Sequence, residues 1–354
     1  MKQIFKKIFL KYKRNSILKS TKKDQFINDR NLWSYRNELT KKERKDIKEF
    51  FKPFFKLDKQ DFLLLGYYKN KLGFYKNTFI PDYYFYTDIK AYLNNQEKGE
   101  NFDNKAYYIK MFPELKQPVT VLCRYGNSKF FDSQYRIISK NNFNVIFEKE
   151  KFYIFKPSIL TSGGNGIFIF KGRCWEEYID VFEKTSDFVV QEVIKQDKNL
   201  SLLSKKSVNT FRIYSLYWNG ETKILGSCIR FGSGDDIVDN FCHGGCFVPI
   251  NEKGELREWG ITHKREKVYS NNGVSFKGII IPNFKNLLDL VKREAYLLPD
   301  IKFIGWDFAL DDAGDFVFIE LNMTQSDPEL LHFVTNGDLF GKDTQDILAK
   351  TYAK

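Results

Sequence analysis

The sequence predicts an α+β fold, and three observations lead to this class. From about residue 113 onward, short apolar runs of β type dominate. Helical patterns lie between some of these runs, notably at 175–185 and 284–297. The 354 residues are 42% hydrophobic, enough for a substantial core, and no uninterrupted apolar run is long enough to cross a bilayer. We therefore expect a soluble globular chain of two or three modules.

Residues 1–112 predict an accessory region that is partly helical and begins with strong positive charge. Residues 1–23 contain nine Lys and Arg residues and no acidic residue, and their apolar residues recur at helical spacing. This pattern is typical either of a basic amphipathic helix on an anionic membrane surface or of an ordinary solvated helix. Thr40 and Glu43 have the spacing of a capping box, which predicts a helix starting after Thr40. Residues 62–111 indicate no function.

The predicted strands divide the rest of the chain into two segments, 113–187 and 188–354. In the first segment the β-type runs are at 119–123, 144–147, 152–155 and 167–170. In the second segment they are at 188–191, 211–217, 224–231, 303–310 and 316–320. Because helical patterns separate some of the strands in each segment, we expect two α+β subdomains.

A glycine-rich segment lies between two of the predicted strands. Lys156 ends the first strand, the loop Thr161-Ser162-Gly163-Gly164-Asn165-Gly166 follows, and the second strand begins at once. Glycine lets backbone N–H groups approach phosphate oxygens closely, and a lysine adds a point charge. The spacing differs from that of a P-loop and of a Rossmann fingerprint. The segment predicts a phosphate-binding loop, with a plain flexible hairpin as the alternative.

Three polar side chains lie on the last two predicted strands. Asp307 lies inside the strand 303–310, and Glu320 and Asn322 end the strand after the turn. Residues two apart on a strand share a face, so the three side chains can converge if the strands pair. Apolar neighbours place both carboxylates on a buried face, where each needs a partner. Such hard oxygen ligands suit Mg²⁺, with phosphate and water completing the coordination shell.

The cysteines indicate neither a zinc site nor a disulfide framework. Cys242, His243 and Cys246 supply at most three soft ligands, and no fourth ligand or matching second cluster is present. A nucleophile pair is also disfavoured, because adjacent residues of an extended chain point to opposite sides. The five cysteines are scattered and odd in number, so reduced thiols and a cytoplasmic protein are expected.

Taken in order along the chain, these features resemble the ATP-grasp superfamily, and within it the branch associated with sugar transfer and polysaccharide synthesis. The lysine strand and glycine loop come first, a hinge-like strand at 189–194 follows, and a Glu-x-Asn strand ends the series. Segments 207–213, 229–232 and 239–245 lie between them and are similar to the branch. The resemblance covers roughly residues 113 to 340. It implies an ATP-grasp fold, in which two α+β subdomains clasp ATP.

The resemblance also implies roles for individual residues. The implied ATP-binding residues, including an adenine-binding hinge, are Lys156, Ser162, Gly163, Gly164, Gly166, Gln191, Glu192, Val193, Ile194 and Asp197. In the branch, a histidine would be expected at the position of Asp197. The sequence therefore departs from the branch pattern at the implied ribose contact. The implied ligands of two Mg²⁺ ions are Asp307, Glu320 and Asn322. The implied catalytic residues are Arg212 and Arg230, as clamps for the γ-phosphate and the carboxylate, and Asn240, near the metals or the acceptor.

The implied activity is that of an ATP-dependent ligase that joins a carboxylate to an amine through an acyl phosphate. We expect the carboxylate to belong to a hexuronic acid, or to a sugar carrying one, of capsular or other surface polysaccharide. The amine would be ammonia, an amino alcohol or an amino acid. A ligase acting on amino acids or peptides is one alternative, and a noncatalytic basic protein that binds nucleic acid or membrane is another.

The net charge of +12 is weak evidence for a polyanion partner. A compositional bias towards Lys, Asn, Ile, Phe and Tyr would produce the same charge without selection for binding. A protein that only binds polyanions also has no use for a carboxylate metal site. We therefore expect no nucleic-acid partner, a cytoplasmic location, and contact with the inner face of the membrane, if any, through residues 1–23.

Overall fold

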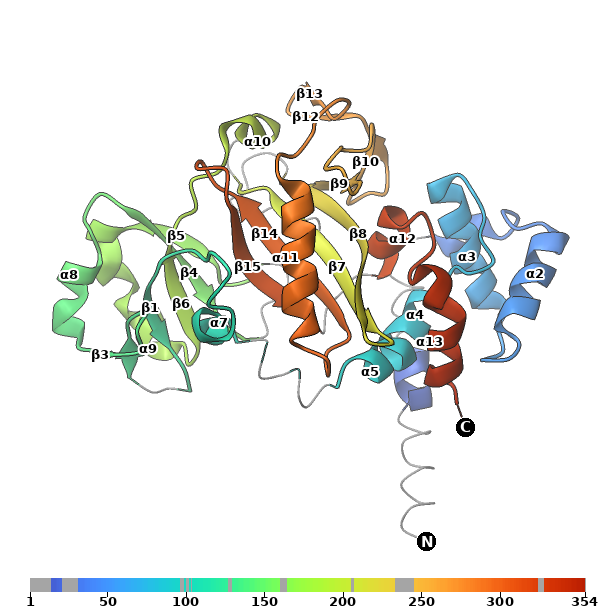
Figure 1. Cartoon of the computed structure of the whole chain (residues 1–354), viewed down its shortest axis with the longest axis horizontal. Helices are drawn as coiled ribbons and strands as arrows, with labels where there is room; N and C mark the ends of the chain where they lie inside the picture. The colour runs from blue at the N-terminus through green and yellow to red at the C-terminus, as the bar shows by residue number, and fades with distance from the viewer. Residues whose placement is uncertain are drawn as a thin grey trace, which may run out of the picture. The chain divides into compact units, whose positions relative to one another are not determined.

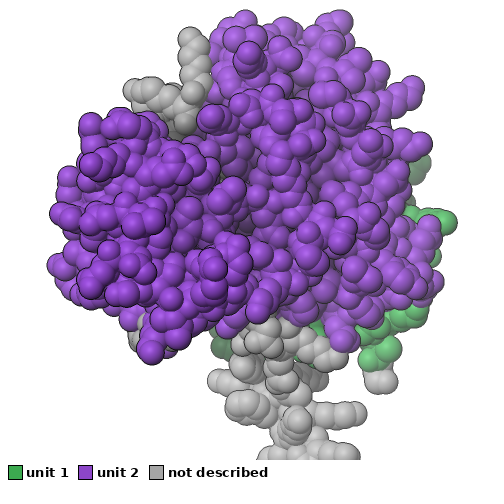
Figure 2. Space-filling model, turned by 60° about the vertical axis from the view of Figure 1, so that its left-hand side comes forward, with its two compact units in different colours: residues 1–95, 327–354 green, residues 96–326 purple. Residues whose placement is uncertain are grey.

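A computed structural model describes residues 14–20, 31–95, 99, 102, 104–126, 129–159, 164–204, 207–232, 245–323 and 328–353. The chain forms two compact units. Unit 1 comprises residues 1–95 and 327–354, and unit 2 comprises residues 96–326 (Figure 2, green and purple). Within the described ranges, no helix has both the length and the apolar character that crossing a membrane requires.

Unit 1 is helical. Its elements are η1 (Leu32–Tyr35), α2 (Lys41–Phe51), α3 (Lys59–Leu72), α4 (Asp82–Tyr84), the π-helical turn η2 (Phe85–Ile89), α5 (Lys90–Leu93), α12 (Pro328–Val334), η8 (Gly341–Asp343) and α13 (Thr344–Thr351). The predicted capping box is confirmed: the Glu43 N–H donates to Thr40 Oγ1 (3.2 Å), and the Thr40 N–H donates to Glu43 Oε2 (2.7 Å). α2 therefore begins at Lys41.

The C-terminal helices belong to unit 1, although the sequence groups 328–353 with the segment that begins at 188. Figure 1 shows α12 and α13 in red beside the blue and cyan helices of the same unit. Lys76 Nζ and Thr78 Oγ1 donate to the carboxylate of Asp338 over 2.6 and 3.0 Å. These contacts join residues about 260 positions apart, so no local pattern could reveal them.

Unit 2 contains a six-stranded sheet of antiparallel pairs in the order β3-β2-β1-β6-β4-β5. Its strands are β1 (Thr120–Arg124), β2 (Phe130–Phe131), β3 (Ile137–Ile138), β4 (Phe152–Pro157), β5 (Phe168–Lys171) and β6 (Phe188–Glu192). Four short helices accompany it: η5 (Lys140–Asn142), α8 (Phe143–Ile146), η6 (Gly172–Tyr178) and α9 (Ile179–Lys184). An aromatic core centred on Phe155, Phe182 and Phe188 packs these helices against one face of the sheet.

The second sheet of unit 2 has seven strands in the order β11-β10-β9-β8-β7-β14-β15, also in antiparallel pairs. These strands are β7 (Thr210–Trp218), β8 (Glu221–Phe231), β9 (Cys246–Ile250), β10 (Gly260–Thr262), β11 (Lys267–Val268), β14 (Phe303–Leu310) and β15 (Phe316–Asn322). The other elements of unit 2 are η4 (Lys105–Tyr107), α7 (Tyr108–Met111), α10 (Lys198–Leu203), α11 (Phe284–Tyr296) and the hairpin β12 (Ser270–Asn271) and β13 (Val274–Ser275).

Helix α11 covers one face of this sheet (Figure 1). Its side chains Leu287 and Val291 join a core cluster with Phe211 and Ile213 of β7. Because successive strand residues face opposite sides, Arg212 between them points to the face away from α11. The largest core of unit 2 therefore lies under α11, and the polar residues of β7 lie on the opposite face.

One predicted strand is wrong. The run 144–147 falls in α8, a short helix that begins at Phe143, whose ring packs on Phe147 (centroids 5.8 Å apart). The three apolar residues at 145–147 are too few to distinguish a strand from a turn of helix, and the contacts of Phe143 decide the outcome. The remaining predicted strands match β1, β4, β5, β6, β7, β8, β14 and β15 within a few residues, whereas β2, β3 and β9 to β13 were not predicted.

Candidate active site

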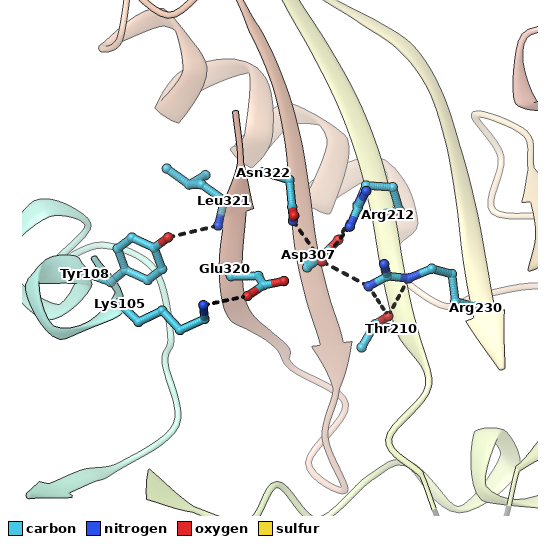
Figure 3. A network of polar contacts seen from close by, with 9 residues as sticks. All are labelled: Lys105, Tyr108, Thr210, Arg212, Arg230, Asp307, Glu320, Leu321 and Asn322. Carbon is cyan, nitrogen blue, oxygen red and sulfur yellow. Dashed lines mark hydrogen bonds and ion pairs between the residues drawn. The ribbon is translucent and has the colours of Figure 1, made fainter. Parts of the chain in front are cut away.

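Asp307 is the centre of a polar network on the seven-stranded sheet (Figure 3). Its carboxylate is 1% exposed and accepts hydrogen bonds from two arginines on neighbouring strands. Arg212 Nε donates to Oδ1, and Arg212 Nη2 donates to Oδ2 over 2.9 Å. Arg230 Nη2 also donates to Oδ2 over 2.9 Å. Two arginines predicted as separate clamps therefore share one buried carboxylate.

Strand register explains this convergence. Arg212 lies directly opposite Asp307, so the two side chains share a face of the sheet. Arg230 of β8 lies opposite Thr210 of β7. Its Nε and Nη2 donate to Thr210 Oγ1 over 2.9 and 2.6 Å, which directs the guanidinium towards Asp307. Thr210 thus orients Arg230, a role that sequence analysis missed because a threonine in a strand carries no signal.

The network fixes the charge states of its members. Burial alone would raise the pKa of Asp307, but the nearby charges of Arg212 and Arg230 lower that pKa to about 2. Burial likewise disfavours the charged form of Arg212, and the Asp307 carboxylate outweighs it, so the pKa of Arg212 is raised well above its ordinary value. Both groups are therefore charged at every physiological pH.

Glu320 and Asn322 complete the triad that the sequence predicted. Glu320 lies directly opposite Asp307 on β15, and Asn322 Nδ2 donates to Asp307 Oδ2 over 3.1 Å. The structure therefore brings Asp307, Glu320 and Asn322 together on one face of two adjacent strands. Strands β14 and β15 follow each other along the chain, and their pairing brings the triad together. Residue spacing could therefore predict the triad.

Lys105 is a site residue that sequence analysis missed. It lies on η4, and its Nζ forms an ion pair with Glu320 Oε2 over 3.1 Å (Figure 3). On the next helical turn, the Tyr108 hydroxyl accepts a hydrogen bond from the Leu321 N–H over 3.3 Å. These two contacts hold the segment against β15. The available signal was slight: Asn104, whose side chain accepts from the Ala106 N–H, caps the short helix that carries Lys105.

The donor set suits Mg²⁺. Asp307 and Glu320 supply two carboxylates and Asn322 an amide oxygen, and Mg²⁺ in phosphate sites commonly uses one or two carboxylates with phosphate and water. Among the residues in the described ranges, Asp307 Oδ1 accepts one hydrogen bond and Oδ2 three, so Oδ1 keeps room for a cation. No group of three or more His, Cys, Asp or Glu residues that could hold a metal ion occurs in that part of the chain.

Lys156 is the buried cation of the six-stranded sheet. It is the penultimate residue of β4 and is 8% exposed, and its Nζ donates to Gln191 Oε1 over 3.1 Å. Gln191 Nε2 in turn donates to Thr120 Oγ1 over 3.1 Å. Burial lowers the pKa of Lys156 to about 8; the charge of Glu320 partly opposes this shift and that of Lys105 adds to it. The charges of Glu320 and Lys105 therefore act on Lys156, although Lys156 and Glu320 belong to different sheets.

The pKa of Lys156 predicts a pH dependence of nucleotide affinity. Phosphate binds the charged lysine, so affinity should be constant below pH 8 and fall as the pH rises through 8. We expect the Kd for Mg-ATP to increase about tenfold between pH 7 and pH 9. Isothermal titration calorimetry across this range measures it. Lys156→Met should bind weakly with no such step, and Lys171→Met, which removes a half-buried lysine paired with Glu150, should keep the step. A flat wild-type profile would contradict the prediction.

In the chain, the glycine loop comes between β4 and β5, and the predicted hinge begins at the end of β6. Gly164 and Gly166 have φ values of 76° and 77°, which glycine adopts readily, and a Cβ at Gly166 would be 3.1 Å from Pro157. Ser162 and Gly163 lie outside the described residues, as does Asn240. The phosphate role of this loop stays a prediction.

The predicted hinge residues begin within β6 with Gln191 and Glu192 and continue beyond the end of the strand. The Glu192 N–H donates to the Val119 carbonyl (2.9 Å), and the Val193 N–H donates to the Phe152 carbonyl (3.2 Å). Val193 and Ile194 are half-buried. Asp197 caps α10, because its Oδ1 accepts from two backbone N–H groups over 2.9 and 3.0 Å. Its side chain thus has a structural role, and the adenine and ribose contacts stay predictions.

Unit 2 contains two sheets. One sheet has a buried lysine before a glycine turn, and the other has the buried carboxylate of Asp307 at the centre of a polar network. This arrangement is expected of the ATP-grasp class. The family described as sugar-transfer associated ATP-grasp matches residues 84–328, more than half of the chain. The chain belongs to this family. The predicted family and fold are confirmed.

Solved structures with partial similarity include ATP-grasp ligases. The ATP-grasp ligase PsnB complexed with minimal precursor is 13% identical, with a TM-score of 0.42 over 73% of this chain and 64% of that chain. The L-amino acid ligase from Bacillus licheniformis is 14% identical, with a TM-score of 0.40 over 72% and 48%. The chain spans less than two thirds of the length of these two proteins. No curated protein matches the sequence significantly.

Proposed function

We propose that this protein is an ATP-dependent carboxylate–amine ligase that forms an amide through an acyl phosphate. The observation that carries the proposal is the grouping of four cations around two carboxylates. Arg212 and Arg230 bind Asp307, Lys105 binds Glu320, and buried Lys156 experiences the charges of Glu320 and Lys105. A net positive site with a hard oxygen triad suits the polyphosphate of Mg-ATP.

Each residue has a distinct proposed role. Lys105 and Lys156 bind phosphate oxygens as point charges, and the arginines orient the γ-phosphate and the substrate carboxylate through their planar donor groups. Asp307, Glu320 and Asn322 would hold two Mg²⁺ ions, which when bound neutralise charge on the transferring phosphoryl group. The glycine loop closes over the nucleotide and excludes water. Asn240 is assigned to the neighbourhood of the metals or the acceptor.

The reaction has two steps. A substrate carboxylate oxygen forms a bond to the γ-phosphorus as the bond to the ADP oxygen breaks, giving ADP and an acyl phosphate. The amine then attacks the acyl carbon, inorganic phosphate leaves, and the amine releases a proton to solvent. Arg212 and Arg230 stabilise the negative charge that develops in both steps, because they are positioned before the substrate arrives.

The family description supports a sugar-derived substrate. We propose that the carboxylate belongs to a hexuronic acid, free or nucleotide-linked, used in capsular or other surface polysaccharide. The amine is ammonia, an amino alcohol or an amino acid. We assign the reaction to the cytoplasm, where ATP is available, with residues 1–23 as a basic contact to the inner face of the membrane.

The test is ADP release by the purified protein with Mg-ATP. The panel contains uronic acids and nucleotide-linked uronic acids, each with and without ammonia, ethanolamine and amino acids. We expect release that requires both a sugar acid and an amine, because the acyl phosphate forms in a closed site and is discharged only by the amine. Mass spectrometry of the product identifies the amide.

Other outcomes would redirect the assignment. Release with free amino acids but not with sugar acids would establish the amino-acid ligase instead. Salt-sensitive binding to nucleic acid without any nucleotide hydrolysis would contradict the enzyme and favour a basic binding protein.

A further inference from the structure

Residues 104–118, which we call the linking segment, contact both sheets of unit 2. The first of these residues pack on the six-stranded sheet. The Lys105 N–H donates to the carbonyl of Ser158, just beyond the end of β4, over 3.3 Å. Ala106 is buried in a cluster with Val189 of β6. The backbone around Lys105 is therefore attached to the six-stranded sheet.

The rest of the linking segment contacts the seven-stranded sheet at β15, which is an edge strand. The Phe318 N–H donates to the Lys116 carbonyl over 2.8 Å. The Lys116 ammonium forms ion pairs with Asp311 and Asp315, in the turn between β14 and β15, over 2.5 and 2.7 Å. One segment is thus bonded to both sheets. Lys105 itself is bonded to both, to one through its backbone and to the other through its side chain.

The Lys105 ammonium lies on a carboxylate that Mg²⁺ would also use. Lys105 Nζ is 3.1 Å from Glu320 Oε2 (Figure 3), and the Lys105 side chain is 11% exposed. Glu320 carries a single negative charge, so an ammonium and a divalent cation held by it repel each other. Water and salt screen this repulsion less at a site that is mostly buried. Lys105 and Mg²⁺ therefore compete for Glu320.

The charges around the triad favour joint entry of metal and nucleotide. Arg212 and Arg230 bind Asp307, and Lys105 binds Glu320, so three cations surround two carboxylates. Such a group does not attract a divalent cation by itself. A polyphosphate brings the missing negative charge and offers the Lys105 ammonium another anionic partner. Metal and nucleotide should therefore each raise the affinity of the site for the other, since such coupling is reciprocal.

We propose that Lys105 is an exchangeable counter-ion of the metal site. Its ammonium holds Glu320 against Mg²⁺ alone and transfers to the nucleotide phosphates when Mg²⁺ and ATP bind together. The inference rests on the proposed ligase function and deepens it, because it assigns the coupling of metal and nucleotide to one residue. Since the Lys105 backbone is bonded to the six-stranded sheet, the transfer also breaks one link between the two sheets.

The test measures metal and nucleotide separately on the full chain. Mn²⁺ replaces Mg²⁺ as a paramagnetic probe, and its Kd without nucleotide is measured by electron paramagnetic resonance. Lys105→Met should bind Mn²⁺ about tenfold more tightly than the wild type, because the competing charge is gone. By calorimetry in EDTA, the same variant should bind ADP about tenfold more weakly, because a charge-assisted contact to phosphate is lost. A merely structural defect would weaken both.

Two further variants assign the effect to the charge of Lys105. Lys105→Arg keeps the charge and should keep the weak Mn²⁺ binding of the wild type. The matched control is Lys116→Met, because Lys116 belongs to the same linking segment and also pairs with carboxylates beside β15. Its loss should change neither Kd.

A measurement on the wild type tests the displacement without any substitution. Acetylation of lysines by an N-hydroxysuccinimide ester is followed by mass spectrometry. Saturating Mg²⁺ should increase the labelling of Lys105, because the ion pair opens, and leave that of Lys116 unchanged. Mn²⁺ binding by Lys105→Met that is no tighter than that of the wild type would overturn the proposal, as would labelling of Lys105 that does not respond to Mg²⁺. Failure of the wild type to bind nucleotide at any Mg²⁺ concentration would instead count against the ligase function.

Discussion

Replacing Glu320 with alanine should lower the rate of ADP release about 10²- to 10³-fold in a protein that remains folded. Glu320 supplies one of the two carboxylates of the triad and neutralises Lys105 across 3.1 Å. Its loss removes a hard oxygen ligand and leaves the positive charge of Lys105 uncompensated. Because the Glu320 side chain is 28% exposed, little folding energy depends on it. ADP release with the substrates found in the panel, and thermal unfolding, measure the two effects.

A control variant tests whether the lower rate is specific to Glu320 or follows from the loss of any carboxylate. Glu252 is exposed in the turn after β9, and Glu252→Ala should match the wild type in rate and in melting temperature. The Glu320 variant should also need more Mg²⁺ for half-maximal ATP binding, because one ligand of the ion is absent. A rate near that of the wild type, with unchanged Mg²⁺ dependence, would refute the assignment of Glu320 to the site.

Replacing Arg212 with methionine should destabilise the protein by about 3 kcal/mol as well as inactivate it. Asp307 is 1% exposed and would lose its bidentate partner while still buried. Arg230 and Asn322 would still donate to Oδ2, which places the cost at the lower end of the range for breaking a buried ion pair. Urea denaturation measures the free energy of unfolding, and ADP release measures the activity.

The double variant Arg212→Met, Asp307→Leu distinguishes stability from function. With both charges removed, the fully buried pair is gone, and only Arg230, which is 17% exposed and still donates to Thr210, loses its carboxylate partner, so part of the lost stability should return. Activity should remain absent, because the site has lost both an arginine clamp and a carboxylate. The pair Arg136 and Asp132 offers a matched control, since its 2.7 Å contact involves an arginine that is 75% exposed. Arg136→Met should cost less than about 1 kcal/mol. An equal cost at both positions would contradict the role of burial.

Several parts of the site follow from sequence because they depend on local geometry. Asp307, Glu320 and Asn322 lie on two strands joined by a short turn, and the alternation of strand residues places them on one face. Lys156 is recognisable because it ends a strand directly before a glycine segment. The capping box of α2 is also local, since Thr40 and Glu43 are one turn apart.

Other parts depend on contacts between distant residues. Lys105 reaches Glu320 over a separation of 215 positions, and no residue pattern near Lys105 announces this contact. Arg212 and Arg230 could be singled out in sequence, but only the pairing of β7 with β8 and β14 shows that they share Asp307.

The sequence by itself therefore determined the class of fold, the triad and the lysine strand, because each rests on the two-residue repeat of a strand or on residues adjacent along the chain. The tertiary structure alone decided which cations surround the triad and that residues 328–353 belong to unit 1. It also decided that 144–146 is helical. The physical reason is common to these cases: hydrogen bonds, ion pairs and burial between residues far apart in sequence select among states that local preference leaves nearly equal in energy.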